Sequence, residues 1–154
     1  MDSATPHDFR HASFHGRIGV ARADITPPVG IYSRNWGAAK HDVAESIHLS
    51  LTLTVLTLAP LEGGSTLVLI DADLGWWKTP QTFQIFQKRL LEMLSLESTN
   101  LIFALSHTHA GPPLMEPDDS LPGSDLLRTW KEDLFESTVA SVRRALNSQC
   151  EATL

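Results

Sequence analysis

The stretch IHLSLTLTVLTL, residues 47–58, decides the fold because apolar and polar side chains alternate along it. Leu49, Leu51, Leu53 and Val55 fall on one face, and Ser50, Thr52 and Thr54 fall on the other. Such alternation predicts a half-buried β-strand. Residues 60–65 contain Gly63-Gly64 and predict a turn, and TLVLIDA, residues 66–72, predicts a second strand buried on both faces. The two runs together predict a β-hairpin.

Other elements follow outward from this hairpin. Residues 17–23 predict an earlier strand, and residues 100–104 predict a short apolar strand. Apolar side chains recur at helical spacing in residues 79–96, which Thr79-Pro80 opens, and again in residues 124–146. The order predicts an α/β domain with a mixed β-sheet covered by helices. Residues 1–16 are expected to be a flexible N-terminal tail, residues 17–154 the domain, and residues 30–45 a long loop.

Two histidines follow the last central strand in LSHTHAGP, residues 105–112. Strand alternation would place His107 and His109 on the same side, and Gly111-Pro112 then turns the chain away. Ligands collect at the carboxyl ends of strands in α/β sheets, and neutral imidazole is a common zinc ligand. A metal or catalytic site is one interpretation, and a chance H-x-H is the other.

Further candidates carry two interpretations each. Asp71 and Asp73 end the second hairpin strand, and Asp73 either orients a metal-bound histidine or closes the strand by accepting backbone N–H bonds. His48 is either a site residue or a half-buried, hydrogen-bonded histidine. Loop 30–45 either borders a ligand site or is an irregular surface loop that Trp36 anchors.

Composition limits the class of protein. Of the 154 residues, 42% are apolar and 19% are charged, as in globular domains, and the net charge of −6 argues against a nucleic-acid partner. A single cysteine, Cys150, excludes an intramolecular disulfide framework and a cysteine-based zinc site. No apolar run is long enough to span a bilayer, and residues 1–16 lack a secretory signal pattern, so the expected location is cytoplasmic.

Three segments, taken in order, resemble the N-terminal part of the catalytic domain of neutral/alkaline, non-lysosomal ceramidases. They are GVARADITPP at residues 19–28, DADLG at residues 71–75 and SHTHAGP at residues 106–112. The family shows G-x-x-x-x-D-I-T, a strand ending in D-L, and H-T-H-S-G-P; Ala110 stands here where Ser is usual. SIHLS at residues 46–50 is similar to the family's G-I-H-x-R but has Ser at both ends.

The resemblance implies a layered α/β/β/α core and a zinc-dependent amidohydrolase of sphingolipid metabolism. Its substrates would be ceramide-like lipids, cut at the N-acyl amide bond. It makes His107 a zinc ligand and places His109 beside the metal in the substrate site, with Asp73 nearby. Family members are often secreted or associated with membranes.

The resemblance covers roughly residues 17–150, and the family's other zinc ligands and its proposed serine lie farther along. A catalytic zinc normally takes three protein ligands and an open position for water. We therefore expect a truncated ceramidase-like domain that is inactive alone, completed by a C-terminal chain or self-associating through an unfinished sheet edge. One alternative is a non-catalytic lipid- or partner-binding module, and another is an unrelated metal-binding protein that uses His107, His109 and an aspartate.

Overall fold

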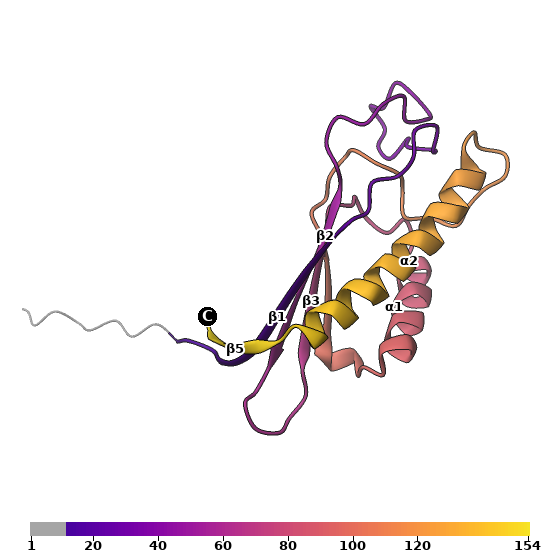
Figure 1. Ribbon diagram of the computed structural model, residues 1–154. Helices are drawn as coiled ribbons and strands as arrows, with labels where there is room; N and C mark the ends of the chain where they lie inside the picture. The colour runs from indigo at the N-terminus through magenta and orange to yellow at the C-terminus, as the bar shows by residue number, and fades with distance from the viewer. Residues whose placement is uncertain (1–11) are drawn as a thin grey trace, which may run out of the picture.

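The computed structural model describes residues 12–154 as one mixed sheet with two long helices (Figure 1). Most of the predicted tail, residues 1–11, lies outside the described residues. The elements in chain order are β1 (His15–Asp24), β2 (Thr52–Ala59), β3 (Leu67–Ala72), α1 (Pro80–Leu94), the 3₁₀ turn η1 (Ser98–Asn100), β4 (Leu101–Leu105), α2 (Ser124–Asn147) and β5 (Cys150–Thr153). This confirms the predicted α/β class.

The sheet has the strand order β4-β3-β2-β1-β5. Strands β1 and β2 are antiparallel, as are β2 and β3 and also β1 and β5, whereas β3 and β4 are parallel. The hairpin predicted from the opening stretch is therefore the β2–β3 pair, and the run at the chain's end pairs with β1. His15 and Gly16, which the sequence predicts to lie in the tail, instead belong to β1.

Strand β2 begins at Thr52, five residues later than predicted. Its partner β1 ends at Asp24, directly opposite Thr52, because Pro27 and Pro28 follow. Residues 47–51 therefore have no continuous strand beside them, and Leu49 is 73% exposed. The alternating pattern continues past the point where pairing stops.

Both helices cover one face of the sheet (Figure 1). Thr79 caps α1, its hydroxyl accepting the Thr82 N–H at 3.2 Å, as the Thr-Pro opening predicts. Helix α2 lies so close to β1 that a Cβ atom on Gly19 would stand 1.9 Å from the Ala145 carbonyl oxygen. The core between the helices and the sheet includes Leu53, Val55, Val68, Ile70, Leu90 and Val142, each at most 1% exposed.

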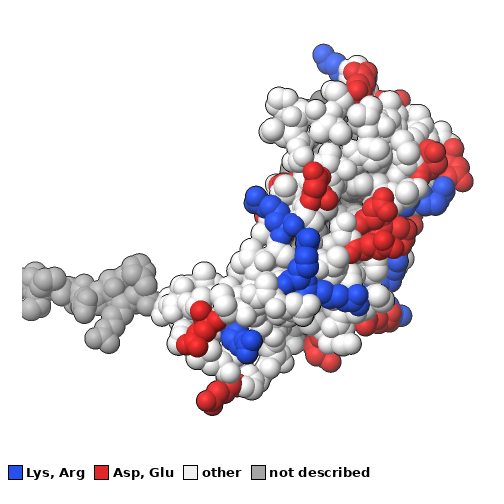
Figure 2. Space-filling view, viewed as in Figure 1, with Lys and Arg blue, Asp and Glu red and all other residues white. Residues whose placement is uncertain are grey.

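The opposite face of the sheet is open in the described part of the chain. The prediction that residues 66–72 are buried on both faces is wrong, because Leu67 and Leu69 are half-buried and Asp71 is exposed. Their strand neighbours Val68, Ile70 and Ala72 are buried under the helices. Acidic and basic side chains intermingle over the helices (Figure 2). No helix among residues 12–154 combines the length and hydropathy that crossing a bilayer would require.

Candidate active site at the strand ends

The two histidines lie in a turn and not on the strand itself. Strand β4 ends at Leu105, and His107 adopts a left-handed backbone with φ of 60°. The alternation argument for His107 and His109 therefore fails, because it requires an extended chain. The turn nevertheless brings the two imidazole rings together, with ring centroids 5.4 Å apart, and both residues are exposed.

Two tryptophans surround this pair. The ring of Trp76 stacks on His107 with centroids 5.1 Å apart and an interplanar angle of 24°, and it meets His109 edge-on at 5.5 Å. Trp36 meets His109 edge-on at 5.0 Å, so loop 30–45 borders the histidine pair. Trp77 points the other way, against Phe83, Phe86 and Phe103. Of the Trp-Trp pair, one ring therefore belongs to the site and the other to the core.

Asp73 is held by the strand across from it. One of its carboxylate oxygens accepts the Thr52 backbone N–H at 3.0 Å and the Thr52 hydroxyl at 2.8 Å, and the Asp73 N–H donates to the Thr52 carbonyl at 2.9 Å. No hydrogen bond links Asp73 to either histidine among residues 12–154. In this geometry the carboxylate closes the end of the β2–β3 ladder.

The D-I-T motif forms a second turn at the same end of the sheet. Asp24 accepts the Thr26 N–H at 2.8 Å, and the Thr26 hydroxyl accepts the Leu51 N–H at 2.9 Å. Hydrogen bonding by the Thr26 side chain and backbone lowers the pKa of Asp24 below its ordinary value. Ile25 is 4% exposed, and its carbonyl accepts the indole N–H of Trp130 at 2.9 Å. The motif thus joins β1 to α2 and to the loop before β2.

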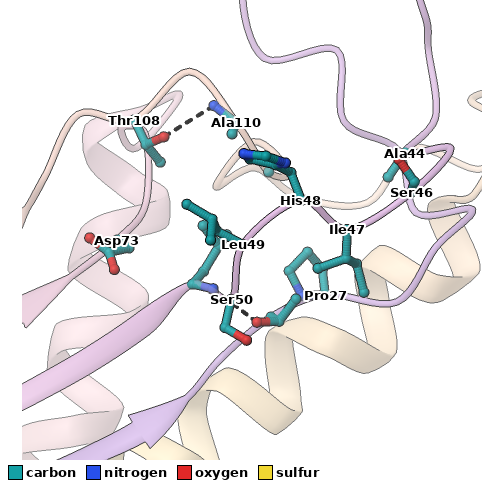
Figure 3. Close-up of a pocket in the computed structure, with 13 residues that line it drawn as sticks. Pro27, Ala44, Ser46, Ile47, His48, Leu49, Ser50, Asp73, Thr108 and Ala110 are labelled. Carbon is teal, nitrogen blue, oxygen red and sulfur yellow. Dashed lines mark hydrogen bonds between the residues drawn. The ribbon is translucent and has the colours of Figure 1, made fainter.

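A cavity of about 410 Å³ lies between these two turns (Figure 3). Thr26 and Pro27 line it from one turn, Thr108, Ala110 and Gly111 from the other, and residues 46–51, including His48, form its remaining wall with Ala44 and Asp73. In Figure 3 Asp73 and Thr108 lie across the cavity from Pro27 and Ile47. Most of the lining side chains are small or apolar, so the cavity suits an apolar group beside the histidine turn.

Lys78 and Gly75, to which the sequence gives no individual role, support the site together with Asn35 of loop 30–45. The Lys78 ammonium donates to the Asn35 carbonyl at 2.7 Å and lies 4.3 Å from the Trp76 ring centre, and partial burial lowers its pKa. Asn35 is 1% exposed, and its side-chain amide has no hydrogen-bond partner within residues 12–154. A Cβ atom on Gly75 would stand 2.4 Å from that amide and 3.0 Å from the Thr108 carbonyl, so only glycine fits between them. Only the folded chain shows that this amide is buried without partners, so no pattern in the sequence indicates it.

The described residues do not complete a catalytic zinc site. His107 and His109 supply two imidazoles at one place, but no cluster of three or more His, Cys, Asp or Glu side chains arranged for a metal occurs among residues 12–154. A catalytic zinc normally takes three protein ligands. The histidine pair is therefore at most part of a ligand set.

Comparison with known proteins gives a likeness of structure. No protein-family model matches the sequence, and no curated protein sequence matches it. The neutral ceramidase from Pseudomonas aeruginosa is similar in structure, with a TM-score of 0.65 and 17% identity over 88% of this chain. A structure of ceramidase complexed with C2 gives a TM-score of 0.60 and 19% identity over the same share.

The chain spans 22% of the length of each of these two ceramidase chains. At this level of identity the likeness concerns the fold, and it confirms at that level the resemblance inferred from the three motifs. The chain has the fold of one part of a neutral ceramidase.

Proposed function

We propose that this chain supplies the histidine-bearing part of a zinc-dependent amidohydrolase site that acts on the N-acyl amide bond of ceramide-like lipids. The observation that carries the proposal is the pair of exposed imidazoles, 5.4 Å apart, on a strand-end turn of a ceramidase fold. The adjacent cavity of about 410 Å³ supports a lipid ligand, since apolar side chains form much of its wall.

The two histidines are given different roles in this proposal. His107 is the zinc ligand, and His109 donates a hydrogen bond to the substrate or to the charge that develops on the scissile carbonyl oxygen. Trp76 packs against both imidazole rings, and Trp36 packs against that of His109. Asp73 contributes indirectly, because its contacts with Thr52 hold one edge of the cavity.

Further ligands are required beyond those that residues 12–154 provide, so we expect no ceramide turnover by the chain alone. The same shortage of ligands favours a second candidate, a non-catalytic lipid-binding module. That candidate needs the cavity but not the imidazoles.

Zinc titration and a fluorescent ceramide test both candidates. We expect weak zinc binding that His107→Ala abolishes and His109→Ala largely retains, with His41→Ala as the control because His41 is exposed and pairs with Glu45 at 2.9 Å. Ceramide binding that survives both site substitutions and zinc removal would favour the lipid-binding module. Zinc binding unchanged in His107→Ala would refute the proposed ligand, and chelator-sensitive release of fatty acid would refute inactivity of the chain alone.

A further inference from the structure

The side chain of Asn35 is buried beside the histidine turn without a partner. Asn35 is 1% exposed, and neither its amide nitrogen nor its amide oxygen makes a hydrogen bond within residues 12–154. An amide that leaves water without gaining hydrogen bonds lowers the stability of the fold, so such groups are rare in folded chains. Because the described residues already cover this amide, a partner must come from its present neighbours or from a molecule small enough to enter.

Gly75 lets the Asn35 amide approach the backbone between the two histidines. A Cβ atom on Gly75 would stand 2.4 Å from Asn35 Nδ2 and 3.0 Å from the carbonyl oxygen of Thr108. That carbonyl accepts no hydrogen bond from the described residues, although the Thr108 hydroxyl accepts the Ala110 N–H at 3.2 Å. A donor and an acceptor that both lack a partner among residues 12–154 therefore flank the same glycine.

The position of Asn35 is set by contacts around the histidine pair. Asn35 precedes Trp36 and Gly75 precedes Trp76, and both tryptophan rings pack against the imidazoles. The Lys78 ammonium joins the two segments, since it donates to the Asn35 carbonyl at 2.7 Å and lies 4.3 Å from the centre of the Trp76 ring. The backbone of Asn35 is thus tied to the tryptophans of the site, while its side chain points at the turn without a bond.

The histidine turn has a backbone that its neighbours must hold. His107 has a φ of 60°, and a residue other than glycine keeps this left-handed conformation only where its surroundings impose it. The Thr108 carbonyl belongs to the peptide that links Thr108 to His109, one residue beyond His107. A hydrogen bond to this carbonyl would therefore fix the directions of both imidazoles.

We propose that Asn35 is a positioning residue of the histidine turn, and that its amide donates to the Thr108 carbonyl in the arrangement of the turn that binds zinc. This inference rests on the proposed function, because it gives Asn35 a task in the histidine-bearing site. Asn35 contacts neither the metal nor the substrate in this proposal and acts through the backbone between the imidazoles. An asparagine with a purely structural role would instead have its amide hydrogen-bonded throughout.

Apolar replacement of Asn35 tests the proposal, because stability and zinc binding should change in opposite directions. Asn35→Leu removes the unpaired amide and should raise the urea midpoint of the chain. The same substitution should weaken zinc binding by about 10- to 100-fold, as the loss of a group that orients a metal ligand does. Asn35→Ala leaves a small cavity and should lower the midpoint, yet it should weaken zinc binding by the same factor.

The matched control is Ser124→Ala. The Ser124 hydroxyl is also buried without a partner among residues 12–154, but it lies at the start of α2. Its removal should leave zinc binding unchanged. A zinc affinity equal to the original in both Asn35 variants would overturn the proposal.

A second measurement does not depend on zinc. The imidazoles of His107 and His109 lie against tryptophan rings, so the NMR shifts of their ring protons report how the imidazoles are oriented. Both sets of shifts should move in Asn35→Leu and in Asn35→Ala, whereas those of His15 on β1 should not. Unmoved shifts of His107 and His109 in both variants would overturn the role of Asn35. If the original chain bound no zinc, the proposed function would fail, and these shifts would still decide whether Asn35 positions the turn.

Discussion

The D-I-T turn and the histidine turn stand at the same end of the sheet but use their side chains in opposite ways. In the first turn, Asp24 accepts the Thr26 N–H, and Ile25 and Thr26 accept hydrogen bonds from other parts of the chain. In the second, His107 and His109 are exposed and touch aromatic rings, with no hydrogen bond to the described residues. The first turn is part of the scaffold, and the second leaves its imidazoles exposed, as the proposed ligand site requires.

This difference separates motifs that sequence resemblance treats alike. D-I-T, D-L-G and H-T-H occur together in the ceramidase-like pattern, yet the hydrogen bonds of the first two close the sheet and shape the cavity wall. Substitutions in the scaffold turn should therefore change stability, whereas those in the histidine turn should change ligand binding.

The largest loss of stability is expected when the tryptophan at the D-I-T turn is replaced, compared with the tryptophan at the histidine turn. Trp130 is 4% exposed and Trp36 is 45% exposed. Trp130→Ala leaves a cavity and an unpaired Ile25 carbonyl, so we expect a loss of about 3–5 kcal/mol in the free energy of unfolding. Trp36→Ala should cost less than about 1 kcal/mol. Urea denaturation measures both, and equal losses would contradict the division between scaffold and site.

A smaller effect is expected at the hydroxyl of Thr26. Thr26→Val keeps the shape of the side chain but leaves the partly buried Leu51 N–H without its acceptor, which should cost about 1–3 kcal/mol. Thr26→Ser retains the hydroxyl and serves as the matched control. If the two variants were equally stable, packing of the methyl group and not the hydrogen bond would hold the loop before β2.

Sequence reasoning predicted the elements well where local signals and tertiary pairing agree. The Thr79-Pro80 opening and the apolar spacing of residues 124–146 located α1 and α2 to within two residues. The prediction failed at residues 47–51, where strand pairing sets the start of β2. The alternation of these residues continues beyond the end of β1, so they have no partner strand. The burial of Asn35 and the positive φ of His107 also depend on the folded chain, so no sequence pattern indicated them.

The backbone of His107 offers a test within the histidine turn. A non-glycine residue in the left-handed region costs about 1–2 kcal/mol, which alanine retains and glycine avoids. His107→Gly should therefore be more stable than His107→Ala by about 1 kcal/mol, although both lose the imidazole that is proposed to bind zinc. At His109, where φ is not positive, glycine should be the less stable replacement. The opposite order at His107 would mean that its ring, and not the turn, imposes the conformation.

The smallest expected effect is the pH dependence of the D-I-T turn. Hydrogen bonds from Thr26 lower the pKa of Asp24 in the folded state, so the ionised carboxylate stabilises the fold above its ordinary pKa. That contribution is lost as the pH falls through the lowered value. Between about pH 5 and pH 2, Asp24→Asn should therefore show a shallower loss of unfolding free energy than the original chain. In the Thr26→Val background, which has lost the side-chain donor, the same substitution should change the slope less. An unchanged difference in that background would assign the low pKa to the backbone N–H at position 26, which the substitution retains, or to the side chain of Ser50.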